Sequence, residues 1–382
     1  MLSRRVFLGA PLAIPFAARS ALGTQSDLVS QTQSDLASQT QSDLASQIYM
    51  SCADDRQREH YIVGFDLAGQ ANIETRFKIK LPARGHGYAQ HAAVRETIVF
   101  GRRPGSFFVA VDAHAGNLIG LIEPPKARCF YGHGTFSHDG ALLYVCEHDD
   151  ASGYGFIGVY DAARGYRRIG DFAAGGIGPH EVRLMPDGRT LVVAVGGIMT
   201  DQARDKLNIA EMDPSLAYID AASGDVVEQV RTASEWHQLS IRHVDLDAWG
   251  RVAIAMQYEG DAGDIVPLAA LHTRGDTGLT YLHAPEDESL RLKQYLGDIA
   301  FSADGRTICA TSPVGSVAAL WDARSGDYLA TSEAADGCGI VALDDAFLVS
   351  GGDGRLRRLD ARLNAPRAAT QWLWDNHLIG IG

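Results

Sequence analysis

The chain consists of repeated units of similar pattern, and a side chain able to bind a metal recurs at the same place in these units. That place is about seven residues before a turn glycine, or the equivalent position in units that lack this glycine. Neutral imidazoles and carboxylates at matching positions of successive strands can hold a transition metal together. Asp298 and Cys338 occupy this position in two units. The predicted metal-binding set comprises the remaining residues at or beside it, together with Glu147 from an adjacent loop: His86, His133, Glu147, His180, Glu181, His243 and His377.

A second group of polar residues lies mainly in the loops expected beside these histidines. Polar groups that converge on one face of a rigid scaffold are where ligands usually bind. Paired arginines, such as Arg102 and Arg103, can hold a carboxylate or phosphate through two parallel hydrogen bonds. The predicted ligand-binding residues are Arg102, Arg103, His148, His237, Arg242, Gln257, Tyr258, Glu259, Asp375 and Asn376.

Three interpretations of the histidines are open at this stage. The first is a structural role, as in repeat proteins where a Gly-His pair and a strand-terminal Asp form a hydrogen-bond network, although here the histidines are expected inside a strand rather than in the loop before it. A metal site is the second interpretation, and it has to be assembled from several strands because no short zinc-type motif is present. The third is an organic or anionic ligand held by Arg102, Arg103 and histidines.

A phrase repeated along the chain predicts the scaffold that brings these residues together. Each copy is an apolar run that in most cases ends in Asp and is followed by small residues and a turn glycine. Repeats of about 40 to 60 residues built from short strands and tight turns indicate a β-propeller with one blade per copy. We therefore predict an all-β, seven-bladed β-propeller. The copies lie at Asp66, Asp112, Asp161, Asp220, Leu271, Asp322 and Asp360.

The two ends of the repeat array predict how the ring closes. Residues 48–52 and 61–67 resemble the second and third strands of a blade, so the first unit lacks its innermost strand. Residues 374–380 follow the last unit and are able to supply that strand. We expect this C-terminal strand to close the first blade, because it removes the open edges that a split blade would leave.

The N-terminus predicts export. Arg4-Arg5 before a short apolar segment fits a twin-arginine signal peptide over residues 1–23, which predicts a periplasmic protein exported in the folded state. The apolar stretch is too short to span a bilayer, so stable membrane insertion is not expected. Residues 24–47 form three polar octads and predict a disordered tether. The propeller is expected over residues 48–382.

Charge and cysteine content exclude several classes of function. The net charge is −13, and removal of the signal peptide takes away three arginines and no acidic residue. Such an acidic surface repels phosphate backbones and anionic lipid, so nucleic acid is excluded as a partner. The cysteines show no CxxC or CxxCH spacing, which argues against a redox dithiol and against covalently attached haem. Their pairing is not determined by the sequence; they are Cys52, Cys129, Cys146, Cys309 and Cys338.

Several longer motifs resemble the domain of unknown function 1513 family over nearly all of the chain beyond the octads. They are RGHGYAQH, GRRPGSF, FYGHGTFS, GVYDAARGYRRIGDF, GGIGPHEVRLMPDGRTLVVAVGG, HQLSIRH, MQYEG and the terminal WDNHL. The resemblance implies twin-arginine export and a seven-bladed propeller. It also implies partners, since genes of this family accompany imelysin-like and di-haem oxidoreductase-like proteins in clusters associated with iron acquisition. No catalytic residue is implied.

Residues and resemblance together lead to one functional hypothesis and two rivals. We expect a non-enzymatic periplasmic protein that binds iron, another transition metal or a metal complex, or a partner protein of an iron-uptake system, at its histidine-rich channel mouth. The first rival is a metal-dependent enzyme of lactonase or dehydrogenase type, which would keep an open coordination position. The second rival is a purely structural scaffold, in which no single residue is decisive.

Overall fold

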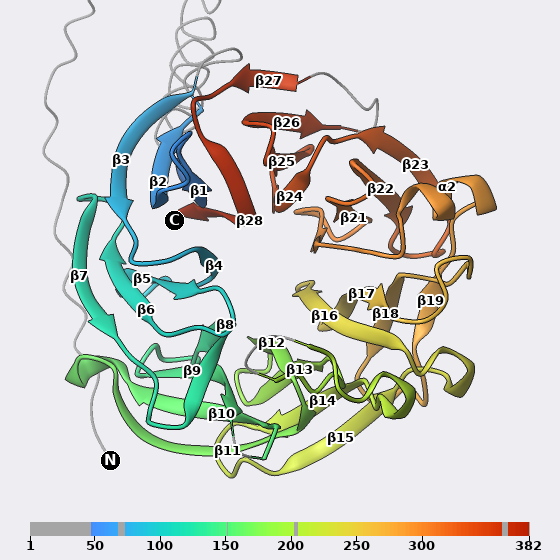
Figure 1. Ribbon diagram of the computed structural model, residues 1–382, viewed down its shortest axis with the longest axis horizontal. Helices are drawn as coiled ribbons and strands as arrows, with labels where there is room; N and C mark the ends of the chain where they lie inside the picture. Colours follow the sequence, from blue (N-terminus) through green and yellow to red (C-terminus); the bar gives the residue numbers. More distant parts are fainter. Residues whose placement is uncertain (1–46, 68–72, 151, 202–204, 361–365, 382) are drawn as a thin grey trace, which may run out of the picture. The chain divides into compact units, whose positions relative to one another are not determined.

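The described chain is a ring of seven four-stranded antiparallel sheets (Figure 1). The computed structural model describes residues 47–67, 73–150, 152–201, 205–360 and 366–381. This confirms the predicted all-β, seven-bladed β-propeller. The predicted signal peptide and nearly all of the predicted tether, residues 1–46, lie outside the described residues.

Six blades are each formed by four consecutive strands, of which the first is innermost. In chain order they are β4 (Gly85–His91), β5 (Val94–Gly101), β6 (Phe108–Asp112) and β7 (Asn117–Ile122); β8 (Arg128–Phe136), β9 (Leu142–Asp149), β10 (Tyr154–Asp161) and β11 (Arg167–Ile177); β12 (Pro179–Leu184), β13 (Thr190–Val195), β14 (Ser215–Asp220) and β15 (Val226–Arg231); β16 (Leu239–Leu246), β17 (Arg251–Tyr258), β18 (Ala269–Thr273) and β19 (Thr280–Leu282); β20 (Asp298–Phe301), β21 (Thr307–Ser312), β22 (Val317–Asp322) and β23 (Tyr328–Glu333); β24 (Gly337–Ala342), β25 (Phe347–Gly351), β26 (Arg355–Leu359) and β27 (Pro366–Ala369).

The remaining blade joins the two ends of the ring, as the sequence predicts. Its outer strands are β1 (Ile48–Asp54), β2 (His60–Asp66) and β3 (Glu74–Lys80), and its innermost strand is β28 (Leu373–Ile381). β28 pairs antiparallel with β1, from Ile48 opposite Ile381 to Asp54 opposite Leu373, with an irregularity near Ser51. There the Ser51 hydroxyl donates toward the carbonyls of Asp375 and His377, at 3.2 and 3.0 Å.

The repeated Asp closes the turn between the third and fourth strands. Oδ1 of Asp220 accepts hydrogen bonds from the backbone N–H groups of Ala222 and Ser223, at 3.0 and 2.8 Å. Gly224 follows with φ +78°, a left-handed conformation that favours glycine. Asp322 makes the same contacts in a later blade. The phrase recurs because each blade needs this turn.

Helices are few and short in the described part of the chain. They are α2 (Glu286–Arg291) and the 3₁₀ turns η1 (Ala162–Arg164), η2 (Ile209–Glu211) and η3 (Ser234–Trp236). None of the helices among these residues has the length and hydropathy needed to cross a bilayer.

The core lies between neighbouring blades, and β28 contributes its largest side chain to it. Trp374 is 2% exposed, and its ring lies 5.0 Å from that of Phe65 in β2. It packs in one cluster with Leu348 and Leu356 of the last blade. The C-terminal strand is therefore held by side-chain packing against both blades that it joins.

Replacing Trp374 with Ala should lower the free energy of unfolding by about 3–5 kcal/mol, because a large buried ring is removed where the ring closes. Urea denaturation followed by far-UV circular dichroism measures the change. Trp249→Ala is the matched control, since Trp249 is 73% exposed, and it should change stability by less than about 0.5 kcal/mol. Equal effects of the two substitutions would contradict the role given to β28.

Candidate functional site

The inner strands bring seven predicted positions together, one from each blade. Glycines at the crossing of β4 and β8 let two of the imidazoles approach. A Cβ on Gly132 would lie 2.4 Å from Cδ2 of His86, and a Cβ on Gly87 would lie 2.6 Å from Nδ1 of His133. The side chains on the inner strands are His86, His133, His180, His243, Asp298, Cys338 and His377.

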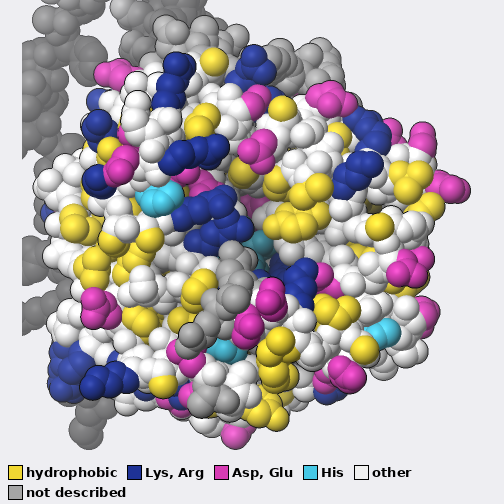
Figure 2. Space-filling view, viewed as in Figure 1, with side chains coloured by type: hydrophobic (Ala, Val, Ile, Leu, Met, Phe, Trp, Pro, Cys, Tyr) yellow, Lys and Arg dark blue, Asp and Glu magenta, His cyan; other side chains and the backbone are white. Residues whose placement is uncertain are grey.

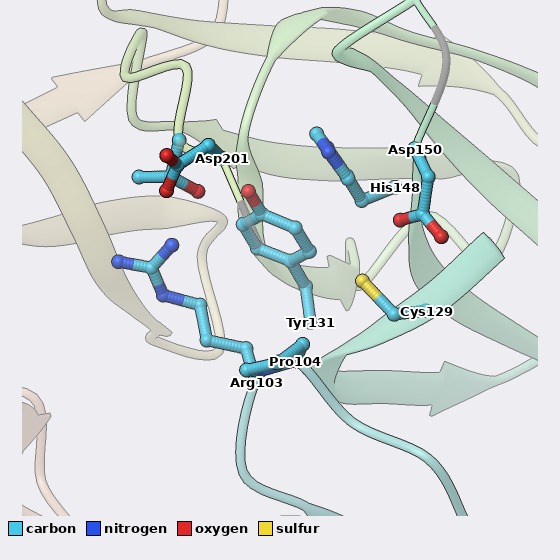
Figure 3. A pocket seen from close by; sticks show the side chains of 8 residues that line it. Arg103, Pro104, Cys129, Tyr131, His148, Asp150 and Asp201 are labelled. Atoms are coloured by element: carbon cyan, nitrogen blue, oxygen red, sulfur yellow. The ribbon is translucent and has the colours of Figure 1, made fainter. Parts of the chain in front are cut away.

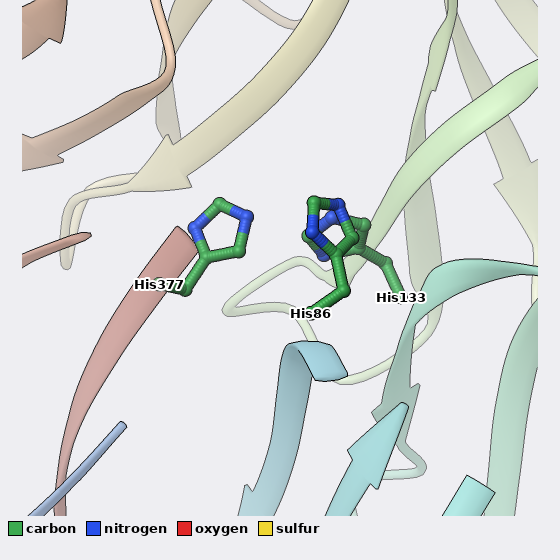
Figure 4. A group of neighbouring side chains, drawn as sticks. All are labelled: His86, His133 and His377. Carbon is green, nitrogen blue, oxygen red and sulfur yellow. The ribbon is translucent and has the colours of Figure 1, made fainter. Parts of the chain in front are cut away.

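Five of these side chains form a compact histidine cluster, which consists of His86, His133, His180, His243 and His377. All five are buried, with 3–7% exposure. His133 lies at the centre, because its ring is 4.7–5.4 Å from each of the other four. Figure 4 shows His377, His86 and His133 extending from β28, β4 and β8 toward one another.

Two overlapping triads of this cluster are spaced closely enough to hold a metal ion. In each triad one nitrogen from every histidine lies within 4.8 Å of the others. The triads are His86–His133–His377 and His133–His180–His243, so His133 belongs to both. Zinc-type ions bind imidazole nitrogens at about 2.0–2.1 Å. The three nitrogens of a triad would therefore have to move closer together to share one ion.

Two carboxylates lie behind the rings rather than between them. Nδ1 of His243 lies 3.1 Å from Oε2 of Glu181, and Nδ1 of His133 lies 3.8 Å from its Oε1. Nδ1 of His377 lies 3.1 Å from Oδ1 of Asp298. Carboxylates in this position fix the tautomer and orientation of metal-binding histidines and leave Nε2 free to bind.

The charge state of Glu181 supports that arrangement. Burial acts to raise its pKa, but the charge of Arg183 and the contact with His243 outweigh burial and lower the pKa to about 2. Nε of Arg183 donates to Oε1 of Glu181 at 2.8 Å. Glu181 is therefore ionised at neutral pH, and its Oε2 accepts a hydrogen bond from Nδ1–H of His243.

Most of the cluster is neutral. Burial, followed by the positive charges of neighbouring groups, holds the pKa of His86, His133 and His180 well below the usual value. Burial also lowers the pKa of His243, against the opposing effect of Glu181. His377 is the exception: burial acts to lower its pKa, but Asp298 outweighs burial and raises it.

Four nitrogens of the cluster are buried without a hydrogen-bond partner among the described residues. They are Nδ1 of His86, Nε2 of His133, Nδ1 of His180 and Nε2 of His377. Buried polar nitrogens are normally hydrogen-bonded, so four in one place require a further partner. A neutral imidazole offers a lone pair, which is the group that a transition metal binds.

A polar pocket of about 280 Å³ opens above the cluster. The loops between the second and third strands line it, as the sequence predicts. Its lining includes three cluster histidines and four cationic side chains: His86, His180, His243, Arg102, Arg103, Lys206, Arg242, Gln257, Glu259, Tyr295, Cys338 and Asn376. Figure 2 shows Lys and Arg side chains around the centre of one face of the molecule.

A second pocket, of about 320 Å³, adjoins the first through Arg103. Figure 3 shows Tyr131 between Arg103 and His148. The Tyr131 ring centroid lies 5.4 Å from the centre of the guanidinium and 5.4 Å from the His148 ring. Cys129 also lines this pocket, and burial raises the pKa of its thiol to about 12, which keeps it protonated.

The structure places four other predicted residues away from the cluster. Glu147 lies on β9, the second strand of its blade, where it contacts Arg128, Arg168 and the hydroxyl of Tyr160 at 2.6–3.1 Å. Tyr258 donates to Asp264 at 2.7 Å. Asp375 pairs with the guanidinium of Arg84, whose Nη2 donates to Oδ1 of Asp375 at 2.6 Å. His237 follows η3 outside the pocket lining.

Lys206 and Arg183 belong to the site but were not predicted. Lys206 reaches Glu259, which is distant in sequence, across the pocket. Nothing in the local sequence signals that contact. Arg183 lies two residues after Glu181 on β12, so both face the same side of the strand. Period-two alternation could have identified Arg183. The described cysteines are all free thiols.

Comparisons with known proteins support the family and the fold. The family described as "Protein of unknown function (DUF1513)" matches residues 79–381. Hydrazine synthase of Kuenenia stuttgartiensis is similar in structure, with 15% identity, a TM-score of 0.58, and 82% of this chain and 95% of that chain covered. The periplasmic gluconolactonase PpgL of Pseudomonas aeruginosa is similar at 14% identity and a TM-score of 0.60, covering 88% and 99%. A comparison with curated proteins gives no match.

The low pKa of the buried imidazoles predicts that acid destabilises the metal-free protein. Below about pH 6.5, His86 and His180 become protonated in the unfolded chain but stay neutral in the folded protein. The free energy of unfolding therefore falls as the pH falls. His377 acts in the opposite direction. Urea denaturation in the presence of a chelator, from about pH 7.5 to about pH 5, measures the slope.

The double variant His86→Gln, His180→Gln should show a shallower loss of stability over this range. His138→Gln is the control, because His138 is exposed, and it should keep the wild-type slope. An unchanged slope in the double variant would contradict the charge states assigned to the cluster.

Proposed function

This chain belongs to the DUF1513 family, and we propose that it is a metal-binding β-propeller whose histidine cluster holds one transition-metal ion. The observation that carries the proposal is the set of four buried imidazole nitrogens without a hydrogen-bond partner among the described residues. The four histidines that carry these nitrogens, His86, His133, His180 and His377, all belong to two overlapping triads.

A purely structural role fits this observation poorly. A buried polar group without a hydrogen bond costs about 1–3 kcal/mol, and the cluster holds four such groups. A structural network would pair each nitrogen with a carbonyl, a hydroxyl or a carboxylate. Here the carboxylates contact only the outer nitrogens of His133, His243 and His377. The remaining nitrogens are positioned for a ligand that accepts several lone pairs at once.

His133 would be the central ligand, because it belongs to both triads. His86 and His377 would complete one set, and His180 and His243 the other. Glu181 and Asp298 would serve as hydrogen-bond acceptors that orient the rings, not as direct ligands, since each contacts the outer nitrogen of a histidine. Imidazole-rich sites suit iron, copper, zinc and nickel.

Iron is the metal that the proposal favours. The site itself is compatible with several transition metals, but the family resemblance associates such proteins with iron acquisition. We propose that the protein acts in the periplasm after twin-arginine export, with imelysin-like and di-haem oxidoreductase-like proteins as partners. Its role would be to bind the metal without chemical conversion of a substrate.

Replacing His86 and His133 together with Gln should abolish metal binding. One triad loses two members and the other loses one, so metal content should fall from about one ion per chain to below about a tenth. Elemental analysis of untagged protein, purified after native export and without chelators, measures it. The thermal unfolding midpoint should stay within a few degrees, because Gln keeps a polar side chain of similar size.

A double variant that does not fold would show that these histidines are structural. His138→Gln, at an exposed position, is the control and should retain the full metal content. A wild-type protein that contains no metal, even after incubation with excess iron, zinc or copper, would contradict the proposed function.

Replacing Glu181 with Gln should weaken Co²⁺ binding by about 10- to 100-fold without abolishing it, because the acceptor that orients His243 and His133 is weakened. Competition with a chromophoric chelator measures the affinity. Glu147→Gln is the matched control: Glu147 is an equally buried carboxylate in a neighbouring blade that contacts arginines. It should lower stability and leave Co²⁺ affinity unchanged, and equal losses of affinity would contradict the assignment.

A further inference from the structure

We infer that the metal is bound together with an oxyanion, of carboxylate or phosphate type, which binds the metal through one oxygen and Arg102, Arg103 and Arg242 through the others. This inference rests on the proposed function and deepens it, because it identifies the chemical class of the species that the pocket accepts. The ligand would be an anionic metal complex rather than a bare cation.

Arg242 is the strongest indication of an anion. Its side chain is only 4% exposed, and its Nε has no hydrogen-bond partner among the described residues. The nearest carboxylate oxygen, Oε1 of Glu259, lies 3.8 Å from its Nη2, which is beyond hydrogen-bond distance. A buried guanidinium with unfilled donors is costly unless an anion completes its hydrogen bonds.

Glu259 alone cannot complete the hydrogen bonds of the Arg242 guanidinium. Its other carboxylate oxygen pairs with Lys206 across the pocket. One carboxylate therefore lies between two cations. The pocket around Arg242 therefore has an excess of positive charge.

Arg102 and Arg103 add two further donors to the same pocket. Neither guanidinium forms an ion pair with a carboxylate of the described residues, and that of Arg103 lies over the ring of Tyr131. Asn376 contributes a third polar group, whose buried Nδ2 also has no hydrogen-bond partner within the described ranges. Guanidinium groups match carboxylate and phosphate through paired hydrogen bonds.

The pocket allows one anion to reach both groups of residues. His86, His180 and His243 line it together with Arg102, Arg103 and Arg242. Its volume of about 280 Å³ lies just below the range of about 300–1,000 Å³ typical of drug-sized ligands. That space suits a small organic acid or phosphate better than a large cofactor.

The charges that line the pocket also favour a bound anion. Four cationic side chains and one carboxylate line the pocket. Imidazoles bind a metal in their neutral form, so the histidines compensate none of its charge. Among the described residues, the carboxylates closest to the cluster are Glu181 and Asp298, and Arg183 already pairs with Glu181. Adding a divalent or trivalent ion therefore leaves a positive centre that an anion would neutralise.

Titration of the full exported protein with Co²⁺ tests the inference. The visible spectrum of Co²⁺ reports its ligands, and titrations are compared in chloride, acetate, malonate and inorganic phosphate at equal ionic strength. In wild-type protein an effective oxyanion should tighten Co²⁺ binding by about tenfold and change the visible spectrum. The carboxylate and phosphate arms show which source of oxyanion the pocket prefers.

The double variant Arg102→Gln, Arg103→Gln should reduce the tightening to below about twofold. Arg306→Gln, Arg324→Gln is the matched control. It removes the same charge from exposed positions and should keep the tenfold effect.

Three outcomes would overturn the inference. Co²⁺ binding that no oxyanion changes would leave the proposed metal function standing and remove the anion from it. Tighter binding without a spectral change would show that the anion acts through charge alone and does not bind the metal. An absence of Co²⁺ binding, with oxyanion binding that depends on Arg102 and Arg103, would overturn the proposed metal function as well.

Discussion

The pairing of β28 with β1 closes the ring, and the arrangement of the centre depends on it. β28 comes from the C-terminus and carries His377, whereas the other cluster histidines lie on β4, β8, β12 and β16. At the irregularity near Ser51, the Ser51 hydroxyl contacts the carbonyls of Asp375 and His377 and so ties β1 to the part of β28 that carries His377. Packing of Trp374 against Phe65 anchors the strand from the other side. Without this closure, the first triad would lose His377 and the first blade would expose an unpaired strand edge.

Closure of the ring also places groups of different charge at successive positions around its centre. Imidazoles occupy the axis, the carboxylates of Glu181 and Asp298 lie behind them, and arginines surround the mouth above. The chain as a whole is strongly acidic, so the pocket is a local region of positive charge on a negatively charged protein. A cation alone would meet repulsion at such a mouth, whereas an anionic complex would be attracted to it and could then exchange its ligands for imidazole nitrogens. Metal binding and anion binding are thus two consequences of one charge distribution.

The sequence alone predicted the seven-bladed propeller and the common level at which the histidines lie on its inner strands. The repeated Asp marks a turn that every blade needs, and a fixed distance before a turn glycine specifies a fixed level on the inner strand. The distance does not specify which way a ring or carboxylate points. Glu147 was predicted in a loop beside the channel, but it lies on β9, a second strand, among arginines, whereas Glu181 contacts histidines. Lys206 was not predicted, because its contact with Glu259 joins two loops that are far apart in sequence. The signal peptide, the tether and the periplasmic location stay predictions.

The most direct test is a crystal structure of the Co²⁺-loaded protein with anomalous scattering recorded at the cobalt edge. The account predicts one strong anomalous peak on the channel axis, about 2.1 Å from nitrogens of His133 and at least two other cluster histidines. Glu181 and Asp298 should remain hydrogen-bonded to the outer nitrogens, without contacting the ion. A cluster that binds no cobalt in well-ordered crystals soaked with excess metal, with ordered waters bonded to the four nitrogens instead, would contradict the account.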